Sequence, residues 1–395
     1  MKGSTHAVVQ NGLDVLLAGG VPSLHGKRLG LITNPTGINR ALQGGVDLLH
    51  ADPRFGLCAL FGPEHGMRGD AQAGVHVQAS TDSRTGLPVY SLYGETRRPR
   101  PEMLQGLDVL LFDLQDIGVR YATYLSTLVY AMEAAAEAGL LFVVLDRPNP
   151  LGGQLLAGNI LHPDFSSFVG IANIPVCHGL TVGEFARLYA AEHALPEPMV
   201  VAMRGWRRDL WFDQLELPWV QPSPNLPTLD AVALYPATCL LEGLSCSEGR
   251  GTTRPFEILG APDIDPFVLA ETLTVHALPG VAFRPLYFTP TFSKHAQTRC
   301  GGIQVYLLDR AQIPLMELGL HLLADLRRLS PLSRTWIQGE NGTYFLDLLC
   351  GSDQVRLALE AGASVAEITA NWEGGLAAFA QRRAPFLLYQ DGIQE

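Results

Sequence analysis

The chain has 395 residues, of which 47% are apolar, and its formal net charge is −11. This length exceeds what one hydrophobic core normally supports, so we expect two domains. The acidic charge and the lack of a Lys/Arg block argue against a nucleic-acid partner, and no apolar run approaches the roughly 20 residues of a membrane-spanning helix, so we expect no membrane contact either.

Near-continuous apolar runs that end in polar residues indicate a parallel sheet in the first part of the chain, since strands covered by helices on both faces have this pattern. The expected strands are 29–32, 57–61, 109–114, 140–145 and 200–203. Helices are expected over 123–138, whose apolar stripe ends at Gly139, and from Thr181, where Thr-Val-Gly-Glu forms a capping box. The predicted fold class is α/β, with a Rossmann-like, mostly parallel sheet.

Five prolines between positions 218 and 236 predict a stretch without regular structure, and we place the domain boundary there. Residues 1–232 would form the Rossmann-like domain. Residues 233–395 would form a smaller α+β domain that completes a cleft. In this second part we expect strands at 281–288 and 302–308, and helices at 313–329, 353–361 and 365–382.

Polar residues follow the predicted strands, at the sheet edge where ligands bind in such folds. Asn34 follows the first strand, and Phe-Gly-Pro-Glu-His-Gly-Met-Arg-Gly (61–69) contains the end of the second. Glu64 is a candidate general acid, because a carboxyl at an apolar strand end can be partly desolvated, although it could instead cap the next helix. His65 would orient Glu64 or a substrate hydroxyl, or else stabilise the loop. Arg68 is a candidate for binding an anionic group.

A second group of candidates follows the third strand, in 113–124. Asp113, Gln115 and Asp116 cannot all point into the core, so some of them would face the crevice. Arg120 has the fork of donors that binds a carboxylate, while Tyr121 and Tyr124 offer flat faces that suit a sugar ring. The alternative is an Asp–Arg pair that merely holds the loop together.

Three later segments add candidates. Asn149, between two prolines, and Asn225, in the proline-rich stretch, are pre-oriented amides that would bind substrate or serve only the turns they lie in. The glycine-rich segment 241–254 contains Glu248, Arg250 and Thr252. Glu248 would be the second carboxylate of a glycosidase pair, or the partner of a nearby arginine.

No cofactor is expected. The predicted strands are not followed by a glycine-rich dinucleotide loop or a phosphate-binding G-x-x-x-x-G-K-[ST] loop. The six cysteines form no C-x-x-C pair, and no histidines stand at zinc-ligand spacing, so we expect structural thiols and no metal site.

Five ordered phrases resemble the exo-β-N-acetylmuramidase family, from about residue 26 to the C-terminus. They are the 61–69 phrase, Asp-Leu-Gln-Asp-Ile-Gly-Val-Arg-Tyr-Ala-Thr-Tyr, Leu-Asp-Arg-Pro-Asn-Pro, Ser-Pro-Asn-Leu-Pro and Ser-Glu-Gly-Arg-Gly-Thr. The resemblance implies a glycoside hydrolase that releases terminal β-linked N-acetylmuramic acid from the non-reducing end of peptidoglycan fragments. It also implies a Rossmann-like domain, a C-terminal auxiliary domain and a cleft between them, with Glu64 at the position of the proposed catalytic glutamate.

The mechanism expected from this resemblance needs no metal. Glu64 would protonate the departing oxygen, while Asp116 or Glu248 activates water, or the 2-acetamido group of the substrate attacks instead. Arg68, Arg120 or Arg250 would bind the lactyl carboxylate that distinguishes muramic acid from glucosamine.

Two other classes of function stay open. A metal-dependent hydrolase would use His65, Asp113 and Asp116 and would lose activity on chelation. A non-catalytic protein would bind muropeptides without turnover. The sequence does not predict the oligomeric state.

The chain departs from the family in two respects. Ala122 stands where members often carry Thr, and the first residues lack the leader of many exported members. We therefore expect a cytoplasmic enzyme that serves the recycling of wall fragments, with export by a leader outside this sequence left open.

Overall fold

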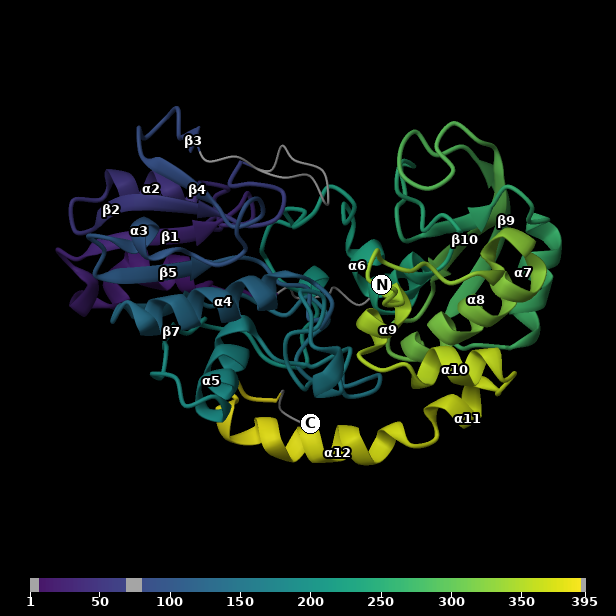
Figure 1. Cartoon of the computed structure of the whole chain (residues 1–395). Helices are drawn as coiled ribbons and strands as arrows, with labels where there is room; N and C mark the ends of the chain where they lie inside the picture. Colours follow the sequence, from purple (N-terminus) through teal and green to yellow (C-terminus); the bar gives the residue numbers. More distant parts are fainter. Residues whose placement is uncertain (1–6, 69–79, 392–395) are drawn as a thin grey trace.

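The computed structural model describes residues 7–68 and 80–391. Within these ranges, the N-terminal region contains a seven-stranded sheet of order β3-β4-β2-β1-β5-β6-β7 (Figure 1). All neighbouring pairs are parallel except β3 with β4. The strands are β1 (Arg28–Thr33), β2 (Gly56–Gly62), β3 (Ser80–Thr81), β4 (Pro88–Ser91), β5 (Val109–Asp113), β6 (Leu141–Leu145) and β7 (Met199–Val201).

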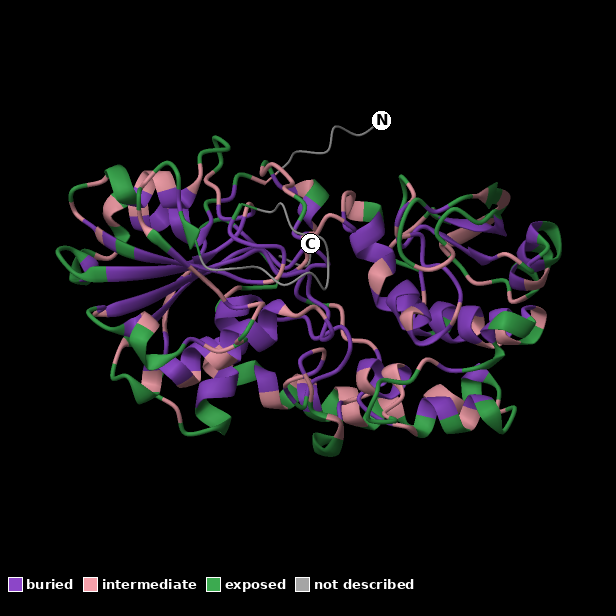
Figure 2. Ribbon diagram, turned by 45° about the horizontal axis from the view of Figure 1, so that its top comes forward, coloured by how far each residue is buried: buried purple, intermediate pink, exposed green. Residues whose placement is uncertain are grey.

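The predicted α/β class and parallel sheet are confirmed. Alternate residues of the strands point to opposite faces of the sheet, and both faces are buried. In β5, Leu110 and Phe112 pack with one apolar cluster, whereas Val109 and Leu111 pack with another. The first cluster includes residues of α4 (Tyr124–Glu137) and α5 (Val182–Glu192), and the second includes residues of α1 (Gly12–Val15) and α2 (Gly45–Ala51). Figure 2 shows the strands buried and the exposed residues on the outer helices and loops. Helices on both faces therefore explain the continuous apolar runs.

The helices of the N-terminal region follow the sequence signals closely where they are long. They are α1 (Gly12–Val15), α2 (Gly45–Ala51), α3 (Pro101–Leu104), α4 (Tyr124–Glu137) and α5 (Val182–Glu192). Gly139, which follows α4, has φ 66, as expected of a glycine that ends a helix. Thr181 caps α5 as predicted, because its hydroxyl accepts from the Glu184 amide and its own amide donates to the Glu184 carboxylate.

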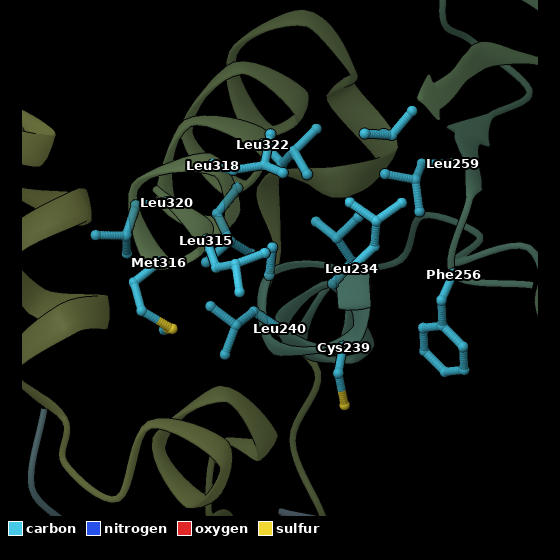
Figure 3. Close-up of a cluster of buried hydrophobic side chains, with 14 of the residues drawn as sticks. Leu234, Cys239, Leu240, Phe256, Leu259, Leu315, Met316, Leu318, Leu320 and Leu322 are labelled. Atoms are coloured by element: carbon cyan, nitrogen blue, oxygen red, sulfur yellow. The ribbon is translucent and has the colours of Figure 1, made fainter. Parts of the chain in front are cut away.

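The C-terminal region combines a small antiparallel sheet with helices. The sheet has the order β8-β10-β9, with β8 (Ile258–Ala261), β9 (Val281–Phe288) and β10 (Cys300–Leu307). The helices are α6 (Leu229–Thr238), α7 (Pro266–Val275), α8 (Leu315–Leu329), α9 (Phe345–Cys350), α10 (Gln354–Glu360), α11 (Val365–Thr369) and α12 (Trp372–Arg383). Figure 3 shows part of the core, in which Leu234 of α6 lies near Leu315 and Leu318 of α8. The two predicted strands and the helices at α8 and α10 are confirmed.

The proline-rich stretch differs from its prediction. The prolines at 218, 222, 224 and 227 precede α6, but Pro236 lies inside it. Thr228 caps the helix by accepting from the Ala231 amide at 3.0 Å. The expectation of no regular structure was therefore wrong for 229–236, since packing of the helix into the core outweighs one missing amide.

A second difference concerns the C-terminal helix, which was expected as one segment over 365–382. The structure has two helices there, because Asn371 lies outside helical geometry with φ −99 and ψ 5. The second of them, α12, runs beneath both halves of the molecule (Figure 1). At its end, Arg383 donates to the carbonyls of His178 and Gly179, and Leu388 donates to the Glu184 carboxylate. The end of the chain therefore contacts the N-terminal region.

The strands and helices that the sequence analysis missed have at most 10 residues each: β3, β4, β8, α1, α2, α3, α6, α7 and α9. Of these, β4 matters most for function. It pairs with β2, so that Ser91 lies opposite Gly62 at the carboxyl ends of both strands. In the described part of the chain, no helix combines the length and apolarity that crossing a membrane requires.

Candidate active site

Glu64 lies on a tight turn that begins where β2 ends. The turn is closed by the Gly66 amide, which donates to the Pro63 carbonyl at 3.0 Å. His65 takes the left-handed backbone conformation with φ 72, which costs roughly 1 kcal/mol in a residue other than glycine. The last residue of the 61–69 phrase, Gly69, lies outside the described residues. The turn thus places a half-buried acid at the carboxyl edge of the parallel sheet, as the sequence predicted.

Two hydroxyl groups position the Glu64 carboxylate. Thr123, directly before α4, donates to it at 2.8 Å. Tyr93 follows β4, and the Leu92 amide beside it donates to the Gly62 carbonyl at 2.8 Å. Burial raises the pKa of Tyr93 to about 12, together with the negative charge of Glu64 and a hydrogen bond to it. Both contacts come from chain segments distant from Glu64 in sequence.

The acid opens into a pocket between the N-terminal and C-terminal regions. Within the described residues, the pocket is lined by Glu64, His65, Ile117, Tyr121, Ala122, Thr123, Tyr124, Pro222, Ser223, Leu226, Tyr235, Arg250 and Phe256. Aromatic rings form much of the wall, and Phe256, like His65, has a left-handed backbone with φ 64. Such strain is most often found at functional sites. A pocket with one acid and several aromatic rings suits a monosaccharide unit.

Tyr121 and Tyr124 line the pocket as expected, but their hydroxyl groups are already used. The Tyr121 hydroxyl donates to the Pro236 carbonyl, and the Tyr124 hydroxyl donates to the Pro222 carbonyl. Asn34 donates from Nδ2 to the Tyr124 hydroxyl at 2.7 Å and is itself buried. The faces of the two rings are therefore available to a ligand. Asn34 hydrogen-bonds to Tyr124 and does not line the pocket, contrary to the expectation that Asn34 binds substrate.

Gln115 and Asn149 serve the backbone instead of the pocket. Gln115 donates from Nε2 to the carbonyls of Asp116 and Pro148, both at 2.7 Å. Asn149 donates to the Leu180 carbonyl and accepts from the Leu151 amide, both at 3.0 Å. Both side chains are buried. Their expected role in substrate binding is corrected to one of holding neighbouring loops.

Asp116 is buried and does not line the pocket, whereas its neighbour Ile117 does. Its Oδ2 accepts from the Gly118 amide at 2.7 Å, and Oδ1 has no hydrogen-bond partner among the described residues. Burial raises its pKa to about 7. The neighbouring His178 has its Nε2 at 3.9 Å from Oδ2, and burial lowers the pKa of this imidazole to about 3. The position does not support the expected activation of water by Asp116.

The buried Asp116 gives a testable pH dependence of stability. Below about pH 4 both states bind the proton; from there to about pH 7 the unfolded chain loses it while the folded chain keeps it, so stability falls as pH rises. Asp116→Asn removes this loss. We expect urea unfolding to show the stability of the variant relative to wild type increasing by roughly 1 to 4 kcal/mol between pH 4 and pH 8. An exposed control, Asp230→Asn, should show little change, and a pH-independent difference for Asp116→Asn would contradict the assignment.

Arg120 does not reach the pocket, although it was expected to bind a carboxylate. Its side chain is 2% exposed, and its terminal nitrogens donate to four main-chain carbonyls, at 2.7 to 3.0 Å. These carbonyls belong to Asn159, Ile174, Leu349 and Cys350, so the guanidinium joins the N-terminal and C-terminal regions. The expectation for Arg120 is wrong, because a guanidinium whose four terminal N–H directions are used has no fork left for a ligand.

Arg68 is also engaged away from the pocket, since its guanidinium lies 2.8 Å from Asp82 and 3.9 Å from Asp47. It is not among the residues that line the pocket. Its expected role in binding an anionic group is therefore not supported by this arrangement.

The 241–254 segment places one of its candidates in the pocket. Arg250 lines the wall, at 2.7 Å from Glu242 and 3.1 Å from Glu248. Glu248 is buried, and its other oxygen lies 3.1 Å from the Lys294 ammonium. The ion-pair alternative for Glu248 is thus observed, and a role as second catalytic carboxylate is not supported. The Thr252 hydroxyl donates to the Gly249 carbonyl within the loop, which corrects its expected contact with substrate.

Asn225 is the one predicted amide that keeps an unused donor. Its Nδ2 is buried without a hydrogen-bond partner among the described residues, and the adjacent Ser223 and Leu226 line the pocket. It therefore stays a candidate for substrate binding. The sequence analysis missed Tyr93, Thr123, Tyr235 and Phe256. The short apolar run of β4 before Tyr93 was the available signal for the first of these.

No group of three or more His, Cys, Asp or Glu side chains suited to a metal ion occurs within 7–68 and 80–391. Five of the six cysteines are buried, Cys58 is exposed, and all six are free thiols.

The fold and the site together define a class of protein. It is a two-domain α/β protein whose parallel sheet presents a carboxylic acid at its carboxyl edge. The acid lies in a tyrosine-lined pocket, closed by the second region, that could hold a sugar ring. Two family models match the chain, described as the N-terminal and C-terminal parts of exo-beta-N-acetylmuramidase NamZ, over residues 29–230 and 233–389. The chain belongs to this family. The resemblance inferred from the five phrases is confirmed.

Relatives of known name or structure match nearly the whole chain. The peptidoglycan beta-N-acetylmuramidase NamZ of Bacillus subtilis (strain 168) is 48% identical over 382 residues, which cover 96% of this chain and 91% of that protein. Two crystal structures of DUF1343 family proteins from Bacteroides fragilis NCTC 9343 superpose with TM-scores of 0.88 and 0.76, at 38% and 31% identity. Each covers 97% of this chain and 99% of the other.

Proposed function

We propose that this protein is an exo-β-N-acetylmuramidase, which hydrolyses the β-glycosidic bond of a terminal N-acetylmuramic acid at the non-reducing end of peptidoglycan fragments. The observation that carries the proposal is the 48% identity, over 96% of the chain, to a protein named for this activity. The position of Glu64 in a ring-lined pocket supports it. The partners of the protein are accordingly small wall-derived saccharides.

Glu64 acts as the general acid. It protonates the departing glycosidic oxygen while the sugar ring gains oxocarbenium character, and the hydroxyls of Thr123 and Tyr93 fix the direction of its carboxyl group. The faces of Tyr121 and Tyr124 provide apolar surface for the sugar ring. Glu64 thereby has the role of the carboxylic acid that protonates the leaving group in glycosidases.

The attacking group comes from the substrate in this proposal. Glu64 is the only carboxylate among the described residues that line the pocket, since Asp116 lies behind Ile117 and Glu248 is paired with Arg250 and Lys294. Within 7–68 and 80–391, no second carboxylate is therefore in place to activate water across the sugar. The 2-acetamido oxygen attacks the anomeric carbon as the glycosidic oxygen leaves with the proton from Glu64. Water then opens the cyclic intermediate at the anomeric carbon, and the two displacements together give retention of configuration.

The test of this function is release of N-acetylmuramic acid from a chromogenic β-muramide, with the matching β-glucosaminide as comparison. We expect multiple turnovers in a time course, and a clear preference for the muramide. Binding of the muramide without product release would support the muropeptide-binding alternative. Loss of activity on treatment with a chelator, restored by a divalent cation, would support the metal-dependent alternative.

A further inference from the structure

The arginines first expected to recognise the lactyl carboxylate are all engaged within the protein. Arg120 donates to four carbonyls, and Arg68 pairs with Asp82 and Asp47. Arg250 lies in the pocket, but two carboxylates balance it and the neighbouring Lys294, so this cluster of two cations and two anions has no net charge. A ligand carboxylate would have to compete with both glutamates for Arg250.

Arg97 differs from these arginines. Its side chain is exposed and forms no ion pair with any described residue, whereas the nearby Arg98 and Arg100 pair with Glu137 and Glu95. Its guanidinium stacks on Phe168, at 4.2 Å from the ring centroid, and lies 5.6 Å from the ring centroid of Tyr93. Stacking on a ring face leaves the N–H groups at the guanidinium edge available to an acceptor.

The sheet places this cation beside the catalytic acid. Because β4 pairs with β2, the loop after Ser91 runs next to the turn after Gly62. Tyr93 in that loop hydrogen-bonds to Glu64 on one side and carries Arg97 over its ring on the other. The charges of Arg97 and Arg250 both oppose the rise in the pKa of Tyr93, which places both cations within electrostatic reach of one phenol. Arg97 does not itself line the pocket, but one aromatic ring separates the acid from this cation, which forms no ion pair with the described residues.

We infer that Arg97 binds the lactyl carboxylate of the muramic acid whose glycosidic bond Glu64 cleaves. The inference rests on the proposed function. The lactyl group is attached to C3, two ring carbons from the anomeric centre. The cation that binds its carboxylate must therefore lie near Glu64 without forming an ion pair with Glu64. A guanidinium held flat by Phe168 presents two parallel donors, which match the two oxygens of a carboxylate. Arg97 determines substrate specificity and takes no part in bond cleavage.

The experiment compares kcat/KM for a chromogenic β-muramide and the matching β-glucosaminide in wild type, Arg97→Met and Arg97→Lys. Loss of a charge-assisted hydrogen-bonded pair should lower the muramide value in Arg97→Met by roughly 10- to 100-fold. The glucosaminide value should change less than about twofold, because that substrate has no carboxylate. Arg97→Lys should retain part of the preference, since the charge stays and the fork is lost. Arg98→Met is the matched control and should leave both values unchanged.

A second comparison uses the carboxamide of the same muramide, in which the lactyl group is uncharged. Wild type should turn this substrate over less well than the muramide, and Arg97→Met should then cause little further loss, because the pair is already broken. A stem peptide also converts the lactyl carboxylate into an uncharged amide, so poor turnover of the carboxamide would indicate that a stem peptide removes the contact with Arg97.

The outcomes separate the inference from the proposed function. If wild type does not release N-acetylmuramic acid, the proposed function fails. If wild type prefers the muramide and Arg97→Met keeps that preference, the assignment of Arg97 is wrong. Equal losses on both substrates would also overturn it, since they would assign Arg97 to the positioning of Tyr93. A loss of preference in Arg250→Met, without one in Arg97→Met, would move the carboxylate to Arg250.

Discussion

Glu64→Gln is expected to lower kcat on a saccharide substrate by roughly 100- to 10,000-fold, the usual contribution of a general acid. Gln cannot donate a proton to the departing oxygen, but it has nearly the same shape and still accepts a hydrogen bond from Thr123. Substrate binding should therefore change little. Steady-state kinetics and a binding measurement on the variant, both with the same disaccharide, test both parts.

The leaving group provides an internal control for this variant. A nitrophenolate leaves without needing a proton, so the loss on a nitrophenyl muramide should be much smaller than on a disaccharide. Glu271→Gln, an exposed change on α7, should have full activity on both. A Glu64→Gln enzyme that cleaves the disaccharide at the wild-type rate would exclude Glu64 as the proton donor.

Arg120→Met is expected to destabilise the protein by about 3 kcal/mol or more, because buried carbonyls that lose their donors cost about 1 to 3 kcal/mol each. The four carbonyls come from both regions of the chain, so the loss weakens their contact. Arg120→Lys should have an intermediate effect, since an ammonium has three donors on a single atom. Urea unfolding followed by circular dichroism measures these differences.

Arg97→Met is the matched control, because the same change at an exposed, stacked arginine should cost no more than about 1 kcal/mol. The two substitutions should thus have different effects: Arg120→Met lowers stability, and Arg97→Met lowers the preference for the muramide. If Arg120→Met keeps wild-type stability and loses the preference, the role expected from its sequence would be correct after all.

Much of the fold was predictable, because burial between two helical layers leaves a strong local pattern. The runs at β1, β2, β5 and β6 are apolar without interruption, and each ends within one or two residues of its predicted position. Capping at Thr181 and the glycine after α4 are also local signals. In contrast, β4 has four residues, and its place beside β2 depends on pairing across the sheet.

The candidate site was predictable only in part. The turn that carries Glu64 follows from a buried strand, proline and flanking glycines, all adjacent in sequence. The partners of polar side chains do not follow in the same way. Arg120 and Arg97 are both arginines in segments that follow strands, yet one lies under four carbonyls and the other on an aromatic ring at the surface. Burial and the neighbouring acceptors decide which arginine remains able to bind a ligand.

The sequence by itself determined the α/β class, the parallel strands, the family resemblance and the position of the acid at a strand end. The tertiary structure alone decided what surrounds that acid: Thr123 and Tyr93 on its carboxylate, Asp116 behind the pocket wall, Glu248 in an ion pair, and Arg97 without an ion pair to any described residue. The physical reason is the distance along the sequence over which each interaction acts. Apolar periodicity and capping act over a few residues, whereas hydrogen bonds and ion pairs in the pocket join residues that are close only after the strands have paired and the two regions have packed together.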